Sequence, residues 1–406
     1  MTSLFTLEKE ADAERLVTLL SESNNDTVRQ RAAEILGDLD VPDDEVVDSL
    51  TTAAQDDSNG AVRAAAIDAL DQREAVEQLI SAIVGEEISG SKAEWARAEE
   101  LTDALTSDQP ELRMAAANVL GRIGSRSATE DLIRRLPDPD PRVRARVARA
   151  LGRLEDKRAV SHLAERRTDE EVDVRRETAE ALGRIEGDEA LSALLGMLND
   201  PAEAVRRITA GSLGNFGSVK PLDALVGLLG DKSEAVRKAA VFSLIELLSN
   251  VPPEQSHELR ETMVQKLSTS DHRVVVSSLV DIIEEGSQAH QRRNATWLLG
   301  RVTGTQHRWE AIETLVGVLD ADDGMTAQFA VTSLATIGGE SVETALLEVL
   351  SDPEATTDAQ AMAAFGLGKV GGERSRERLD TLVDTTDDEE VRKRAFSALS
   401  KLGGRA

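Results

Sequence analysis

The sequence predicts an all-α protein built as a solenoid of stacked helix pairs, and three observations support this. The pattern L/V-R-x-x-A-A-x-x-x-L-G-x-I/L returns every 31 residues, in copies that open at Leu112, Val143, Val174, Val205 and Val236. Aromatic residues make up only 2% of a chain rich in helix formers. A unit of this length cannot bury an apolar face alone and must stack on its neighbours. We therefore expect a right-handed α-solenoid of antiparallel helix pairs.

Each repeat ends in an amphipathic helix, for which residues 174–185 serve as the example. Val174, Thr178, Leu182 and Ile185 are spaced as one stripe of a helix with 3.6 residues per turn, and this stripe is the predicted core. Gly183 lies near the end of the same segment, where a residue without a side chain suits a close helix crossing or the start of a turn.

A second ladder with the same period precedes each of these helices and predicts a first helix in every unit. Aspartate follows it in the turn, where its side chain can cap the next helix, and proline fits the first turn of that helix. The ladder consists of Leu132, Leu163, Leu194 and Leu225; the turn residues are Asp138, Asp169, Asp200 and Asp231, with prolines at 139, 141 and 201.

The combined pattern D-P-x-x-x-V-R-x-x-A-A-x-x-L-G-x-L resembles the short HEAT-like repeat named after phycobilisome lyases, and the resemblance covers nearly the whole chain. Signatures of tetratricopeptide and ankyrin repeats are missing. The resemblance implies that the recurrent arginine is structural and pairs with turn aspartates of its own or an adjacent repeat, as expected for Arg144, Arg175, Arg206 and Arg237. Copies begin at Val28, Val62, Leu112, Val143, Val174, Val205, Val236, Val274, Gln291, Thr326, Ala359 and Val391.

We expect residues 1–406 to form a single solenoid of about 11–12 repeats with two irregular places. Near residues 71–111 there is room for an additional helix, with amphipathic segments at 74–84 and 92–105. Near residues 245–325 the repeat at Gln291 begins only 17 residues after the one at Val274, so it should follow another second-type helix directly.

Composition bounds the environment of the protein. A net charge of −28, with 37 arginines against 10 lysines, is typical of adaptation to a very salty cytoplasm, as in a halophilic archaeon. The absence of cysteine excludes disulfides, thiolate nucleophiles and zinc sites with cysteine ligands. Without a signal sequence or an apolar run of membrane-spanning length, we expect a soluble cytoplasmic protein with no membrane insertion.

Charge is uneven along the chain, which points to candidate binding residues. Residues 112–168 form a basic island with 14 basic and 7 acidic residues. Separately, Trp297 stands four residues from Arg293 and from Arg301, so the three should share one helical face; this is the composition of a binding hot spot, although Trp297 could equally plug the irregular joint. The residues expected to line a concave groove are Arg122, Arg146, Arg149, Arg153, Arg176, Arg207, Lys238, Phe242, Arg293, Trp297, Arg301 and Phe365.

Catalytic motifs are not found. The five histidines lack H-E-x-x-H spacing, and neither a phosphate-binding glycine loop nor a nucleophile elbow is present, so we expect no enzyme activity, cofactor or metal. The leading prediction is a scaffold that holds a protein partner in its groove, and a partner with an acidic segment would suit the basic residues there.

Three more specific functions follow from the resemblance. HEAT-like proteins of halophilic archaea include one associated with chemotaxis genes, which implies an adaptor between signalling and the motility motor. Resemblance to phycobilin lyase subunits implies chromophore attachment. Other HEAT-like proteins grip DNA with a basic face, here the island at 112–168, but molar salt would weaken phosphate contacts and makes nucleic acid an unfavoured partner.

Overall fold

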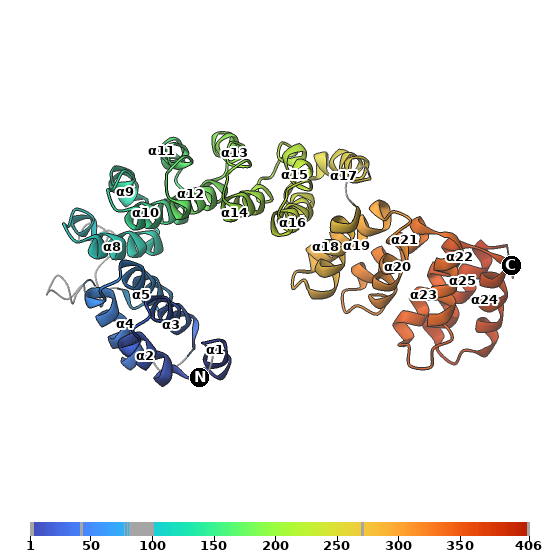
Figure 1. Cartoon of the computed structure of the whole chain (residues 1–406). Coiled ribbons are helices and arrows are strands. Elements are labelled where there is room, and N and C mark those ends of the chain that lie inside the picture. Colours follow the sequence, from blue (N-terminus) through green and yellow to red (C-terminus); the bar gives the residue numbers. More distant parts are fainter. Residues whose placement is uncertain are drawn as a thin grey trace. The chain divides into compact units, whose positions relative to one another are not determined.

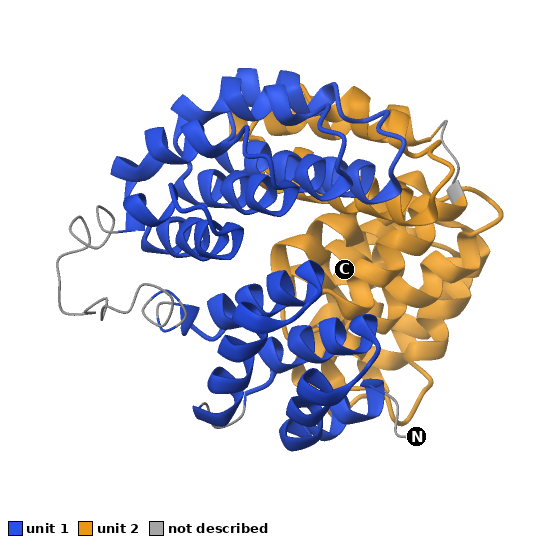
Figure 2. Cartoon of the chain, turned by 60° about the vertical axis from the view of Figure 1, so that its left-hand side comes forward, with its two compact units in different colours: residues 1–212 blue, residues 213–406 orange. Residues whose placement is uncertain are grey.

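Helices follow one another as pairs joined by short turns in the computed structural model (Figure 1). The structure describes residues 4–40, 44–76, 78, 80, 101–268 and 272–403. Within these ranges the regular elements are α-helices and two short 3-10 turns, with no strand, which confirms the predicted all-α fold class. The chain divides into two units, residues 1–212 (unit 1) and 213–406 (unit 2), coloured separately in Figure 2.

Unit 1 contains the regular repeats, in which the second helix of each pair packs on the second helices of its neighbours. Thus α10 packs between α8 and α12, and α3 packs on α5. Its described helices are α1 (Leu4–Glu10), α2 (Ala13–Glu22), α3 (Asp26–Asp38), α4 (Asp44–Asp56), α5 (Gly60–Gln72), α8 (Pro110–Ile123), α9 (Thr129–Arg135), α10 (Pro141–Leu154), α11 (Val160–Arg166), α12 (Val172–Ile185), α13 (Asp188–Leu195) and α14 (Glu203–Leu213), with 3-10 turns η1 (Arg126–Ala128) and η2 (Lys157–Ala159).

Unit 2 continues the same arrangement, with α19, α21, α23 and α25 packed in succession as second helices. Its described helices are α15 (Leu222–Leu228), α16 (Glu234–Asn250), α17 (Pro253–Leu267), α18 (His272–Glu285), α19 (Ala289–Val302), α20 (Arg308–Gly317), α21 (Gly324–Ile337), α22 (Gly339–Val349), α23 (Thr357–Val370), α24 (Glu373–Thr385) and α25 (Glu389–Lys401).

The apolar stripe predicted for each second helix forms the core. In α12 the side chains of Val174, Thr178, Leu182 and Ile185 are all buried. Leu163 and Leu194 on the adjoining first helices α11 and α13 are also buried. Because each helix is apolar on one stripe, burial is completed only by the next pair in the stack.

The repeated glycine marks the closest crossing of second helices. A Cβ added at Gly152 on α10 would lie 2.7 Å from the Cα of Ala181 on α12. In unit 2, a Cβ at Gly300 on α19 would lie 2.6 Å from the Cα of Ser333 on α21. Both are far below normal contact, so glycine here allows two backbones to approach, and of the two roles expected for it the close crossing is the one observed.

The recurrent arginine ties successive turns together as the resemblance implied. Arg144 on α10 is buried and donates to Asp169 through Nε (2.9 Å) and Nη2 (2.8 Å), and its Nη1 donates to the carbonyl of Asp138 at 2.9 Å. Arg175 repeats both contacts one unit later, with the side chain of Asp200 and the carbonyl of Asp169. The predicted structural role of this arginine is therefore confirmed for these copies. Arg206 and Arg237 donate in the same way to the carbonyls of Asp200 and Asp231.

The turn aspartates act differently from the prediction. The side chain of Asp138 does not cap α10; it accepts the backbone N–H of Asp140 at 2.9 Å and holds the turn. Asp140 is the N-cap and accepts the N–H of Arg142, while Pro141 occupies the first helical turn as expected. At α10, Asp138 therefore shapes the turn and binds Arg113, and Asp140 caps the helix.

The irregular places also differ from expectation. Most of the segments expected to be helical at 74–84 and 92–105 lie outside the described residues. Near residues 245–325, α18 carries the Val274 copy but contacts α20, the first helix of the following pair, so it occupies a first-helix position and not the expected second. The additional helix is α17, which contacts α15, α16 and α19. Among the described residues, no helix combines the length and apolar character needed to cross a bilayer.

Candidate functional site

Four arginines of the basic island, Arg122, Arg146, Arg149 and Arg153, lie on the second helices α8 and α10 of unit 1 and form ion pairs with carboxylates there. Arg149 on α10 donates to Glu177 on α12 through Nε (3.1 Å) and Nη2 (2.9 Å). Arg146 on α10 pairs with Asp68 on α5 through Nε at 2.9 Å and through Nη2, and Arg149 also approaches Asp68 at 3.4 Å. Helices far apart in the sequence are thus joined through charge.

The charged groups of this cluster shift the pKa values of one another. Burial by itself lowers the pKa of Arg149, but the hydrogen bond to Glu177 and the charge of Asp68 outweigh burial and raise it. Burial likewise acts to raise the pKa of Glu177, and the bond from Arg149 overcomes it and lowers that pKa. Both groups are consequently charged across the physiological range.

The remaining predicted residues on α8, α10 and α12 are paired in the same manner. Arg153 donates to Asp71 at 2.9 Å, and Arg122 lies 3.8 Å from the same carboxylate. Arg176 on α12 contacts Glu177 at 3.1 Å and Asp173 at 3.2 Å. The carboxylates that neutralise these five arginines belong to residues 68, 71, 173 and 177, all outside the basic island.

A polar groove of about 600 Å³ lies between α3, α5, α10 and α12. Its lining alternates in charge, with Glu34, Asp68 and Asp173 facing Arg146 and Arg176 among others. Because the cations are already bound by carboxylates, a phosphate backbone would have to displace those ion pairs to dock here.

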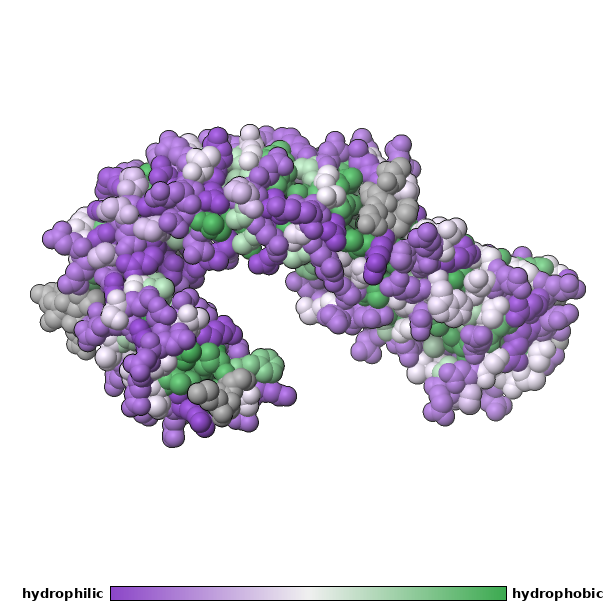
Figure 3. All heavy atoms as spheres, viewed as in Figure 1, coloured by the Kyte–Doolittle hydropathy of each residue, from purple (hydrophilic) through white to green (hydrophobic). Residues whose placement is uncertain are grey.

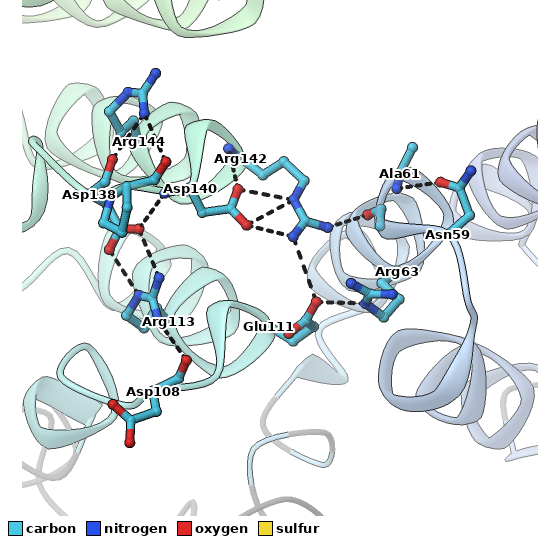
Figure 4. A network of polar contacts seen from close by, with 12 residues as sticks. Asn59, Ala61, Arg63, Asp108, Glu111, Arg113, Asp138, Asp140, Arg142 and Arg144 are labelled. Atoms are coloured by element: carbon cyan, nitrogen blue, oxygen red, sulfur yellow. Dashed lines mark hydrogen bonds and ion pairs between the residues drawn. The ribbon is translucent and has the colours of Figure 1, made fainter.

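A neighbouring polar network joins α5 to α8 and α10 (Figure 4). The chain segment between α5 and α8 lies mostly outside the described residues. Arg142 donates to the carbonyl of Gly60 at 2.6 Å, and its other nitrogens contact Asp140. Glu111 accepts from Arg63 at 2.6 Å. The arginines around α10 therefore support the packing of unit 1 in addition to covering its surface.

Three further predicted residues occupy exposed positions. Arg207 on α14 is exposed. Lys238 on α16 forms ion pairs with Asp281 at 3.0 Å and Glu234 at 3.8 Å, and Phe242 one turn later is 43% exposed. Hydrophilic residues predominate on the face shown in Figure 3.

Trp297 in unit 2 is the centre of a different arrangement. The guanidinium of Arg301, on the same helix, lies 4.5 Å from the centroid of the indole, and that of Arg260 on α17 lies 4.6 Å from it. Both distances are within the range of a cation–π interaction. Arg293, expected on the same face, instead pairs with Asp323 at the start of α21 at 2.6 Å. The sequence-based prediction thus missed Arg260, which is 37 residues away and joins the ring only because α17 packs on α19.

The two arginines on this ring have neutral hydrogen-bond partners. Arg260 donates to Asn294 Oδ1 at 3.0 Å and to Ser256 at 3.4 Å, while Arg301 donates to the carbonyl of Trp297 at 2.8 Å. In the described part of the chain, neither arginine forms an ion pair. Burial lowers the pKa of Arg260, and burial together with the charge of Arg260 lowers the pKa of Arg301.

Phe365 on α23 forms a second aromatic cluster with cations. Lys369, Lys401 and Arg394 lie 5.1, 5.3 and 5.7 Å from its ring centroid. Arg394 is also paired with Glu390 on its own helix. Between this cluster and Trp297 lies α21, whose fourteen residues include no charged side chain. Nothing in the local sequence pattern around Phe365 identified Lys401, which comes from α25.

Over the ranges that the structure describes, no three histidine, aspartate or glutamate side chains are placed to hold a metal ion. The clusters around Trp297 and Phe365 present positive charge and aromatic surface, which can bind a partner.

Comparisons with known proteins identify the same type of repeat as the sequence pattern. A sequence profile for HEAT repeats matches residues 13–84, 98–179 and 166–245. Over 407 aligned residues, the chain is 58% identical to a HEAT repeat-containing taxis protein of Halobacterium salinarum, a halophilic archaeon, covering 100% of both proteins. Among solved structures, an engineered protein is 21% identical with a TM-score of 0.41, covering 97% of this chain and 100% of its own. The predicted repeat type is confirmed, and the acidic, arginine-rich composition agrees with the relative's source.

Proposed function

Because this chain belongs to the HEAT-repeat family, we propose that it is a non-catalytic scaffold that holds protein partners of the taxis signalling system in the cytoplasm. The observation that carries this proposal is the end-to-end identity of 58% with a taxis protein. The alignment covers the whole chain, so the irregular places and the candidate binding surfaces fall within it.

The geometry supports a binding role. Stacked second helices present side chains at fixed positions along one surface, and the buried arginine–aspartate pairs hold successive turns in register. A surface fixed in this way loses little conformational entropy when a partner binds. The finer form of the proposal is that the partners connect taxis signalling to the motility machinery.

Cross-complementation tests the taxis role. In a Halobacterium salinarum strain that lacks the 58% identical relative, expression of this chain should restore directed swimming in a soft-agar or phototaxis assay. An empty vector and the relative's own gene give the lower and upper limits. A chain that accumulates as folded protein to the relative's level but restores no taxis would contradict the proposal.

A further inference from the structure

We propose that Arg260, Trp297 and Arg301 form a docking site for a carboxylate-rich segment of a partner protein. This inference rests on the proposed function, because it specifies the chemistry of a partner that the scaffold holds. The site lies wholly within unit 2, on α17 and α19.

The first argument is geometric. The indole holds both guanidiniums, and each is further fixed by a neutral acceptor: Asn294 for Arg260 and the carbonyl of Trp297 for Arg301. An arginine has five N–H donors, so these contacts leave several on each side chain. A guanidinium stacked on a ring keeps the edge that binds a carboxylate in two parallel hydrogen bonds.

The second argument is electrostatic. The chain carries a net charge of −28, and in unit 1 the half-buried arginines Arg146 and Arg149 are each bound by carboxylates. Arg260 and Arg301 are also half-buried, yet they lie near one another and, among the described residues, near no carboxylate that raises their pKa. Two like charges in such a place are stabilised by an incoming anion, whereas the surplus acid of the rest of the chain repels one.

The surface beyond the pair favours an extended acidic segment over a single ion. The uncharged helix α21 packs on α19 and separates it from α23, where Lys369 and Lys401 flank Phe365. Both lysines are exposed and, within the described ranges, form no ion pair. A segment whose first carboxylates bind the arginine pair would therefore meet an uncharged strip and then further cations.

A protein segment fits these features better than a nucleic acid. Only two arginines converge at the ring, and a phosphate backbone gains affinity from many contacts that salt weakens strongly. Half-buried charges are screened less than exposed ones, so a carboxylate bound between them tolerates a salty medium better.

The test uses the full-length protein and a fluorescent peptide of alternating glutamate and serine, with a glutamine–serine peptide of equal length as the uncharged probe. Anisotropy in a series of KCl concentrations should show binding of the acidic peptide alone. The double variant R260Q/R301Q should bind it at least about tenfold more weakly, as expected for removal of charged hydrogen bonds at a binding site.

The matched control is R134Q/R184Q, which removes two exposed arginines of unit 1 paired only with neighbours on their own helices. It should bind like the wild type, and all proteins should keep the same circular dichroism spectrum. Equal binding by R260Q/R301Q, or no binding of the acidic peptide to the wild type, would overturn the docking site. Duplex DNA binding with the same dependence on Arg260 and Arg301 would also overturn it, in favour of a nucleic acid.

Complementation separates this inference from the proposed function. If the wild-type chain restores taxis and R260Q/R301Q does not, although it is folded and equally abundant, both stand. If both chains restore taxis, the docking site fails and the proposed function stands. If the wild type itself restores no taxis, the proposed function fails, and the peptide experiment still decides whether Arg260 and Arg301 bind carboxylates.

Discussion

In unit 1, Arg146 and Arg149 meet the carboxylates of Asp68 and Glu177, whereas in unit 2 Arg260 and Arg301 meet the ring of Trp297. The repeat beneath these surfaces is the same, with close crossings at Gly152 in one unit and Gly300 in the other. An arginine bound to a buried carboxylate is occupied, and its removal leaves an unpaired charge. An arginine stacked on an indole is held in place but keeps its charge available for a ligand.

The comparison also shows how charge along the chain differs from charge in space. Residues 112–168 contain 14 basic and 7 acidic residues, which made them one of two candidate binding surfaces in the sequence. The carboxylates that compensate Arg146, Arg149 and Arg153 come from α5 and α12, outside that window. Only packing brings them together, so the count of positive residues along a segment does not give the charge of the surface that they form.

The largest effect on stability is expected from an arginine that joins successive turns of unit 1. Arg144→Ala removes both hydrogen bonds to Asp169 and leaves a nearly buried carboxylate unpaired, which should lower the free energy of unfolding by about 3–5 kcal/mol. Chemical denaturation measures this loss. The exposed pair of Arg184 with Glu180 is the control, and Arg184→Ala should cost at most about 1 kcal/mol. Similar losses in both variants would mean that the buried pair has no special role.

The direct test of the comparison sets Arg149→Gln against Arg301→Gln. Loss of Arg149 removes the main partner of Glu177, whose side chain is 4% exposed, and should lower the free energy of unfolding by about 1.5–3 kcal/mol. Loss of Arg301 leaves no carboxylate without its partner. It should change the free energy of unfolding by about 1 kcal/mol or less, the scale of one cation–π contact. Equal losses, measured by denaturation at one salt concentration, would remove the distinction between the two surfaces.

The close helix crossing should respond alike in both units. Gly152→Ala places a methyl group against the backbone of α12 and should cost about 1–3 kcal/mol, and Gly300→Ala should cost a similar amount against α21. Gly211 on α14 has open space at the same atom, so Gly211→Ala should stabilise the helix by about 0.5–1 kcal/mol. A harmless Gly300→Ala would show that the two units do not share this crossing.

The smallest expected effect is a pH dependence of the Arg149–Glu177 pair in unit 1. The pKa of Glu177 is lowered below the ordinary value of a glutamate, so its charged form stabilises the fold above that ordinary value, and this contribution is lost as the pH falls through the lowered pKa. Glu177→Gln should therefore cost about 1–2 kcal/mol at pH 7 and progressively less below pH 4.5. Unfolding curves of both proteins at several pH values measure the difference. A difference independent of pH would contradict the ion pair.

Sequence alone determined the helix pairs, because their period, apolar stripe and small residues are local patterns with local causes. Arg144 and Arg175 were assigned correctly to a structural role because arginine recurs at the same position in the regular repeats that open at Leu112, Val143, Val174, Val205 and Val236. The turn was less predictable: Asp138 and Asp140 compete for the capping role, and only backbone geometry decides which one caps.

The tertiary structure decided which cations are neutralised and which are not. Asp68 meets Arg146 across 78 residues. Arg260 meets Trp297 because it lies on the additional helix α17, whose position in the stack the repeat spacing did not reveal. Electrostatic interactions depend on distance in space and on burial, and neither quantity is recorded by spacing along the chain once a repeat departs from its period. The sequence therefore specified the repeated framework, and the packing of its irregular helices determined where charge is left for a partner.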